Sequence, residues 1–177
     1  PIVKDYYDPK FLFPSKTRTF CTNSGNAHVV QEKYTSSDGK DYYLVNGHAY
    51  SSETTPNNMV NFAMLRTNFF TEPMASGQDF AEYLAKMAML AGGGHPIYQR
   101  VEDIRLHTRS TAEGEKNFNF KPTLSSAIPG DITMVMPTKF FNSIWKSLKL
   151  LDTIVPGVLN PNTILYYPEI KLYANKP

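Results

Sequence analysis

The stretch over residues 76–111 constrains the fold most, because it joins an amphipathic helix to a flexible turn and a dense polar run. Ser76 is a good helix N-cap. Apolar residues then recur at helical spacing: Phe80, Tyr83, Leu84, Met87, Leu90 and Ala91. We predict a helix over 78–91 that turns this stripe toward a core, with Glu82 and Lys86 paired on its outer face.

Three consecutive glycines, Gly92 to Gly94, end this predicted helix and can supply the left-handed dihedrals of a turn. The His95-Pro96 step then favours extended backbone. A polar run follows: Gln99, Arg100, Glu102, Asp103, Arg105, His107 and Arg109. Such a run faces a ligand, another domain or solvent, and composition favours solvent. A phosphate-binding role for the glycines is disfavoured, because the C-terminal end of a helix dipole repels anions.

The remaining elements are strands in clusters and one more helix. Strands are expected over 18–22, 27–35, 41–46, 58–71 and 163–173, with turns or loops at 23–26, 37–40 and 46–48. Short strands are expected at 132–136 and around 118–120. Pro137 fits the first position of a helix over 137–151 with the apolar stripe Phe140, Phe141, Ile144, Trp145, Leu148 and Leu151, so Trp145 should be buried.

Clustered rather than alternating elements predict an α+β fold with one mostly antiparallel sheet, open or curled toward a barrel, and two main helices. The composition, 41% apolar and 19% charged, is that of one globular domain spanning 1–177. Within it, 1–17 are expected to form an extended arm and 76–155 a loop-rich helical insert. Because the chain begins at Pro1, it is expected to be a processed product or a piece of a longer protein.

Charge, cysteine and histidine usage narrow the possible functions. A net charge of +2 is too small for a dedicated duplex-DNA binder. The lone Cys21 excludes an intrachain disulfide, and a buried, inert thiol is favoured over a nucleophile assisted by His28 or His48. The four histidines lack metal-ligand spacing, so no metal is assigned. The chain has no apolar run of about 20 residues, so we expect a cytoplasmic protein without a membrane partner.

A series of segments in fixed order carries a resemblance to a known family. They are TRTFCTNSGNAHVV at 17–30, LVNGHAYS at 44–51, NNMVNFAMLRTNFFTEP at 57–73, LAGGGHPIYQRVEDI at 90–104, RST at 109–111, PTLSSAIPGDITMVMP at 122–137, and LDTIVPG with TILYYPEIKLY near the end. Together they resemble the middle region of bacterial FAD-dependent dehydrogenases, described as uncharacterised FAD- or NAD-utilising flavoproteins. The resemblance covers nearly the whole chain.

This resemblance implies a cap or substrate domain inserted in an FAD-binding, Rossmann-like parent. The implied cofactor is FAD, with NAD(P) as a further candidate, and the implied partners are the Rossmann-like domain of the same chain and a small-molecule substrate. This chain has no GxGxxG fingerprint, so we expect the fragment alone to be inactive and to retain no FAD. The alternative is a stand-alone binding module for a protein or, less favoured, single-stranded nucleic acid.

The resemblance brings no established catalytic residue, so the site is predicted from side-chain chemistry. Flexible glycines and hydrogen-bonding side chains coincide in the segments 23–26, 46–48 and 94–100. The candidate cofactor- or substrate-facing residues are Asn23, Gly25, Asn46, Gly47, His48, His95, Gln99 and Arg100. The plainer alternative is that these segments are ordinary loops.

Overall fold

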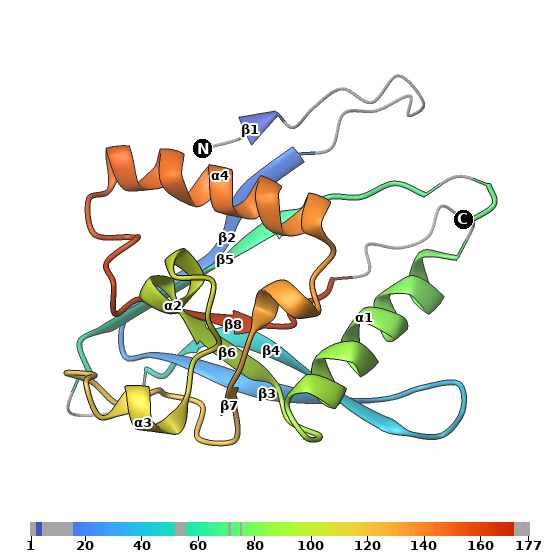
Figure 1. Cartoon of the computed structure of the whole chain (residues 1–177), viewed down its shortest axis with the longest axis horizontal. Helices are drawn as coiled ribbons and strands as arrows, with labels where there is room; N and C mark the ends of the chain where they lie inside the picture. Colours follow the sequence, from blue (N-terminus) through green and yellow to red (C-terminus); the bar gives the residue numbers. More distant parts are fainter. Residues whose placement is uncertain (1–2, 5–15, 52–55, 71, 75, 172–177) are drawn as a thin grey trace.

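The computed structural model describes residues 3–4, 16–51, 56–70, 72–74 and 76–171, and it has the predicted α+β fold (Figure 1). Its strands are β1 (Val3–Lys4), β2 (Lys16–Gly25), β3 (Ala27–Thr35), β4 (Asp41–Ala49), β5 (Met59–Arg66), β6 (Ile97–Arg100), β7 (Ile128–Pro129) and β8 (Ile164–Tyr167). Its helices are α1 (Gly77–Ala91), α2 (Val101–Arg105), α3 (Ala112–Glu115), the 3-10 turn η1 (Ile132–Met134) and α4 (Thr138–Ile154). Most of the expected arm, and the end of the last expected strand, lie outside the described residues.

The strands form three small sheets and not the single sheet expected. Their orders are β1-β2-β5, β3-β4 and β7-β6-β8, and every pairing is antiparallel except that of β6 with β7. Among the described residues these sheets do not close into a barrel. Segment 23–26 is not a hairpin turn, because β2 pairs with β5 while β3 pairs with β4. The chain therefore passes directly from one sheet into the next at Asn26.

The β3–β4 hairpin is the part of the sheet structure that local sequence predicted best. Gly39, with φ +77°, donates its N–H to the Ser36 carbonyl at 2.9 Å and closes the expected turn. The two strands then pair without a break from Thr35 and Asp41 to Ala27 and Ala49. Segment 46–48 is consequently strand and not loop, because its backbone remains paired with β3.

Helix α1 begins and ends as predicted, but its buried face is rotated. The Asp79 N–H donates to the Ser76 hydroxyl at 3.2 Å, Gly92 is the C-cap, and the Glu82–Lys86 ion pair is formed at 2.7 Å. The buried residues are Leu84, Ala85, Ala88 and Met89. Tyr83 and Leu90, expected on the apolar face, are exposed because the small alanines make the close contact with β4 and β6.

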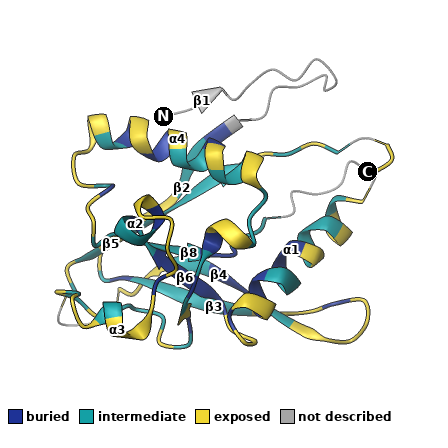
Figure 2. Cartoon of the chain, viewed as in Figure 1, coloured by how far each residue is buried: buried dark blue, intermediate teal, exposed yellow. Residues whose placement is uncertain are grey.

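Helix α4 packs against β2 and β5, also with a shifted face (Figures 1 and 2). Its buried residues are Ser143, Ser147, Leu148 and Leu151. The two serines suit a close approach to β2, since the Ser143 and Thr17 hydroxyls bond at 2.9 Å and the Ser147 hydroxyl donates to the Ser143 carbonyl. Trp145, predicted to be buried, is half-buried and stacks on Phe141 with ring centroids 5.9 Å apart.

Two buried clusters join these layers. One contains Ala88, Met89, Ile97, Ile132 and Tyr167, and the other contains Val101, Leu148 and Leu159. Strand β6 is central in its sheet and almost wholly buried (Figure 2). Its Ile97 belongs to the first cluster, and Val101 of α2, which follows directly, belongs to the second. The β6 sequence IYQR was not predicted as a strand. The Val45 N–H donates to the Pro168 carbonyl at 2.8 Å and links the β3–β4 hairpin to the segment after β8.

Other local expectations were wrong. The segment 132–136 begins with the 3-10 turn η1, because Asp131 caps it by accepting the Thr133 N–H at 2.9 Å. No strand forms around 118–120, where Phe118 and Phe120 stack on each other instead. Cys21 is exposed and not buried, since it lies with φ +47° where the β2–β5 register shifts.

In the described part of the chain, no helix has the length and apolar character needed to cross a membrane.

Candidate functional site

A cleft of about 550 Å³ lies at the centre of the molecule, where the three sheets and α4 meet. Strand β5 contributes residues 59–64 to its wall, and β8 contributes residues 164–167. Helix α4 supplies Phe141, Ile144, Trp145 and Leu148. A volume of this order is typical of small-molecule sites, which are mostly apolar with a few placed polar groups.

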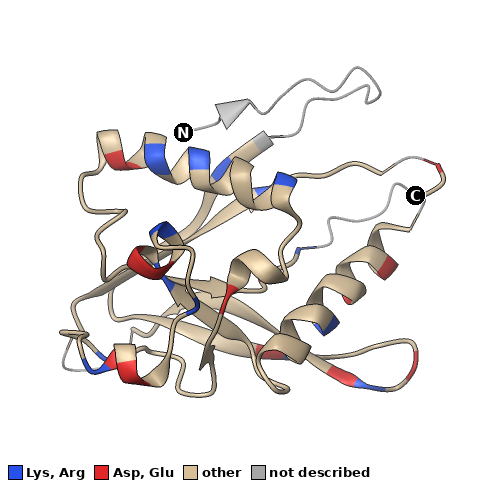
Figure 3. Ribbon diagram, viewed as in Figure 1, with Lys and Arg blue, Asp and Glu red and all other residues tan. Residues whose placement is uncertain are grey.

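The polar groups that line the cleft are almost all neutral. They include five asparagine side chains and a threonine: Asn46, Asn61, Asn119, Asn160, Asn162 and Thr123. Among the described residues that line the cleft, Glu169 is the only one with a formal charge at neutral pH. Figure 3 shows that β8, which runs beside the cleft, carries no charged residue. The cleft therefore offers amide hydrogen bonds, apolar contacts and one carboxylate.

A row of asparagine hydrogen bonds fixes one side of this cleft. Asn23 donates to the Asn61 side-chain oxygen at 2.9 Å, and Asn61 donates to the His28 carbonyl at 2.8 Å. The first bond lies within the β2–β5 sheet, and the second ties that sheet to the β3–β4 hairpin. Gly47 permits the contact, because a Cβ at that position would lie 2.7 Å from the Asn61 oxygen.

Glu169 lies among charged groups at the β4 side of the cleft. Its side chain is 14% exposed, and the Lys171 ammonium is 3.6 Å from its Oε1 atom, longer than a hydrogen bond. The same ammonium is 4.0 Å from Glu32, whose other oxygen accepts a 2.7 Å hydrogen bond from Asn46. Burial raises the pKa of Glu169, and Lys171 only partly offsets this effect.

The carboxylate of Glu32 accepts more hydrogen bonds than that of Glu169. Burial opposes its ionisation, but hydrogen bonds from Asn46 and Tyr34, together with the Lys171 charge, outweigh burial and lower the pKa of Glu32. The Glu169 Oε1 atom, in contrast, is buried and has no hydrogen-bond partner among the described residues, although it lies within ion-pair distance of Lys171. Burial likewise raises the pKa of Tyr167, which borders the cleft and whose hydroxyl is also unpartnered.

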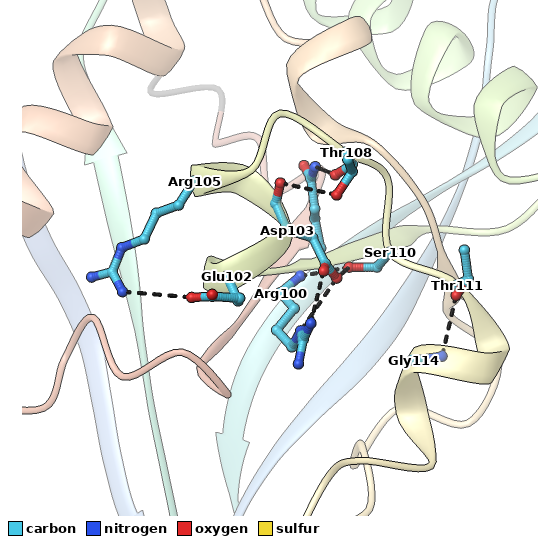
Figure 4. A network of polar contacts seen from close by, with 9 residues as sticks. Arg100, Glu102, Asp103, Arg105, Thr108, Ser110, Thr111 and Gly114 are labelled. Atoms are coloured by element: carbon cyan, nitrogen blue, oxygen red, sulfur yellow. Dashed lines mark hydrogen bonds and ion pairs between the residues drawn. The ribbon is translucent and has the colours of Figure 1, made fainter.

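The polar run after β6 forms a second cluster, shown in Figure 4. Arg100 donates to Asp103 at 2.9 Å, and its backbone N–H donates to the Ser110 hydroxyl at 2.8 Å. Ser110 in turn donates to Asp103 at 2.6 Å, which completes what we call the Asp103 network. The hydrogen bond and charge of Asp103 raise the pKa of Arg100, which therefore remains a cation.

Gln99 connects this cluster to the core. Its amide donates to the Thr108 carbonyl at 2.8 Å, and its oxygen accepts the Ile132 N–H at 2.8 Å. The residue is fully buried. Both ends of the amide are thus engaged inside the protein, and together with the Asp103 network they hold the loop 106–110 against β6.

The structure separates the predicted site residues into groups. Asn46 and Gly47 line the cleft, and Asn23 lies against them through Asn61. Gly25 and His48 are exposed strand residues, and His95 is exposed in the turn after α1. Gln99 and Arg100 belong to the second cluster. A cofactor- or substrate-facing role for any of the eight stays a prediction.

Several cleft residues were not singled out from the sequence. Asn61 had a usable signal, because it is a polar residue inside the apolar run MVNFAML. Glu169 follows Pro168 in the segment 163–173, which was expected to be a strand broken or bulged at that proline, and no motif marks Glu169 as part of a site. Trp145 was expected in a sealed core and instead lines the cleft wall.

Within the residues that the structure describes, no group of three or more His, Cys, Asp or Glu side chains is arranged to hold a metal ion. A comparison with models of known protein families and with curated proteins found no match to this chain.

Proposed function

We propose that this chain is the substrate-binding cap domain of an FAD-dependent oxidoreductase, and that the central cleft is its substrate-facing wall. The observation that carries the proposal is the cleft itself: about 550 Å³, mostly apolar, and lined by amides with a single carboxylate. The segment-by-segment resemblance to bacterial FAD-dependent dehydrogenases supports the flavin context. A bound flavin would supply the hydride chemistry.

The lining suits an uncharged ring edge and not the pyrophosphate of FAD. The described residues of this lining include no Lys, Arg or His, and the glycines Gly92 to Gly94 follow a helix instead of preceding one. The ADP half of the cofactor is therefore assigned to the parent's Rossmann-like domain. In this chain, Asn46 and Asn61 can donate or accept hydrogen bonds to a ring edge or substrate.

The apolar wall has a second task in this proposal, the exclusion of water. Phe141, Trp145 and Leu148 of α4 face the cleft, together with residues of β5 and β8. A dry wall strengthens the hydrogen bonds made inside it and limits side reactions of a reduced cofactor. The asparagine row holds this wall in place, since Asn23 fixes Asn61 within its own sheet and Asn61 bonds to the neighbouring sheet at His28.

The complete reading frame tests the proposal. We expect the frame to encode a strand-turn-helix segment with GxGxxG upstream of Pro1, and the protein made from it to purify with bound FAD. An Asn61→Ala variant of that protein should retain FAD, because the pyrophosphate is held elsewhere. A frame without such a segment, or a colourless full-length protein, would contradict the proposal and favour a stand-alone binding module.

A further inference from the structure

The cleft has an uneven charge content that points to a ligand class. Of the described lining residues only Glu169 is formally charged, and the nearest charged groups are Lys171 and Glu32. Two carboxylates therefore share one ammonium. With all three groups ionised, the local charge is −2 + 1 = −1. An added cation would balance this cluster, whereas an added anion would be repelled.

Glu169 also has hydrogen-bonding capacity that the protein does not fill. Among the described residues its buried Oε1 atom has no hydrogen-bond partner, and the ammonium of Lys171 is 3.6 Å away and also lies 4.0 Å from Glu32. Tyr167 also borders the cleft and is only 6% exposed. Its hydroxyl likewise has no hydrogen-bond partner among the described residues. Buried polar atoms without partners destabilise a fold, so such atoms beside a cleft indicate groups that a ligand completes.

The rest of the wall favours a ring or other apolar body. Aromatic side chains come from four parts of the chain: Phe62 from β5, Phe120 from the loop before β7, Phe141 and Trp145 from α4, and Tyr166 and Tyr167 from β8. Aromatic faces attract organic cations as well as rings. The wall therefore matches a molecule that is apolar over most of its surface and carries one positive group.

We propose that the cleft binds a small, ring-bearing primary amine, whose ammonium donates to the Glu169 carboxylate while its ring packs against the aromatic wall. This assignment rests on the proposed cap function, and it makes amines the substrate class of the parent flavoprotein. The same charges disfavour carboxylate and phosphate substrates, because the described residues of the lining include no cation to pair with them. Neutral alcohols retain the apolar contacts and lose the charge-assisted hydrogen bond.

The chain carries its own probe for this test, since Trp145 is its only tryptophan and lines the cleft. Tryptophan fluorescence of the 177-residue chain would be titrated with 2-phenylethylamine, 2-phenylethanol and phenylacetate, three probes with the same ring. We expect the amine to bind about 10-fold or more tightly than the alcohol, and the carboxylate to bind most weakly.

Two variants assign the preference to Glu169. Glu169→Gln keeps the side-chain shape and removes the charge, so the amine should lose its advantage while the alcohol binds as before. Glu113→Gln, at an exposed site on α3 outside the cleft, should leave all three affinities unchanged. Circular dichroism of each variant establishes that it is folded.

Three outcomes would overturn the inference: equal affinity for amine and alcohol, tightest binding of phenylacetate, or an amine preference that survives in Glu169→Gln. Binding of none of the probes would also overturn it. None of these results bears on the reading frame or on FAD content, which test the proposed cap function. The failure of one proposal can therefore be told from the failure of the other.

Discussion

At the residue scale, positions that matter through a single contact are the hardest to recognise from sequence. Gly47 is unremarkable in the string LVNGHAYS, yet its missing Cβ makes room for Asn61. Asn61 is held at both ends, accepting from Asn23 and donating to the His28 carbonyl. The Asn61 amide therefore cannot rotate away from a Cβ added at Gly47 without breaking a hydrogen bond.

The first prediction is that Gly47→Ala lowers the free energy of unfolding by about 1–3 kcal/mol through overpacking. The added Cβ would lie 2.7 Å from the Asn61 oxygen and 3.2 Å from the Asn23 amide nitrogen. Urea denaturation measures the change. In an Asn61→Ala background the same substitution should cost less, because the blocking oxygen is gone. Equal costs in both backgrounds would show that Asn61 is not the obstacle.

The second prediction concerns the pH dependence that Glu169 produces. Burial raises its pKa above the ordinary value of 4.5, so the native state binds the proton more tightly than the unfolded chain. Its contribution to stability is therefore full at low pH and is lost as pH rises from that ordinary value through the native pKa. The free energy of unfolding of the wild type, relative to Glu169→Gln, should fall across this window.

Urea denaturation of both proteins over a pH series measures that difference. The neighbouring carboxylate of Glu32 does not produce the same dependence. Its pKa is lowered, so Glu32 titrates below the window and with the opposite sign. A difference that is constant or grows with pH would contradict a raised pKa for Glu169.

At the element scale, periodicity predicts the existence of a helix better than the face it buries. The α1 and α4 helices appear close to their expected bounds, because caps and spacing are local properties. Their buried faces are shifted toward Ala85 and Ala88 in one and Ser143 and Ser147 in the other. Close packing favours small side chains at contacts, and the neighbour that imposes this choice is distant in sequence.

Strand β6 and helix α2 show what local patterning does not reveal. The segment IYQRVEDIR has no clear alternation, yet it contributes to the interior because Gln99 and the Asp103 network satisfy its polar groups. The polar run was expected to face solvent, a ligand or another domain. Arg105, His107 and Arg109 are exposed, as expected of a solvent-facing run. Gln99, Arg100 and Asp103 instead brace the loop through contacts with Thr108 and Ser110 that only the tertiary structure establishes.

The third prediction tests that brace. Asp103→Ala should lower the free energy of unfolding by about 2–3 kcal/mol, because it leaves the Arg100 guanidinium, 17% exposed, without its anion and removes the Ser110 bond. Chemical denaturation provides the measurement. The matched control is Glu102→Ala, whose pair with Arg105 is exposed and 3.9 Å long, with an expected cost below about 1 kcal/mol. Similar costs for both variants would refute the brace.

At the scale of the whole molecule, the class of fold was predictable and the division into sheets was not. Antiparallel pairing of β3 with β4 follows from a local turn, whereas β2 finds its partner β5 across the intervening hairpin. The choice depends on contacts such as Asn23 with Asn61, which no local pattern encodes. For the same reason the sequence marked Asn46 and Gly47 but missed Glu169, because these residues meet only in the folded chain.

The last prediction is that the 177-residue chain folds alone, is colourless and binds FAD with a Kd of about a millimolar or weaker. Two buried clusters and hydrogen bonds between the sheets support independent folding. Tight binding of FAD is helped by backbone amides at a helix N-terminus and by cations against the pyrophosphate, and the described residues that line the cleft include no Lys, Arg or His.

A flavin ring held only by Asn46, Asn61 and partial stacking must first offset several kcal/mol of lost translational and rotational freedom. The visible spectrum of the purified chain and calorimetric titration with FAD measure the outcome. Circular dichroism and a cooperative urea transition report folding in the same sample. A yellow protein with one flavin per chain would place the whole cofactor site within these 177 residues, and a chain without a cooperative transition would show that the fold depends on its parent.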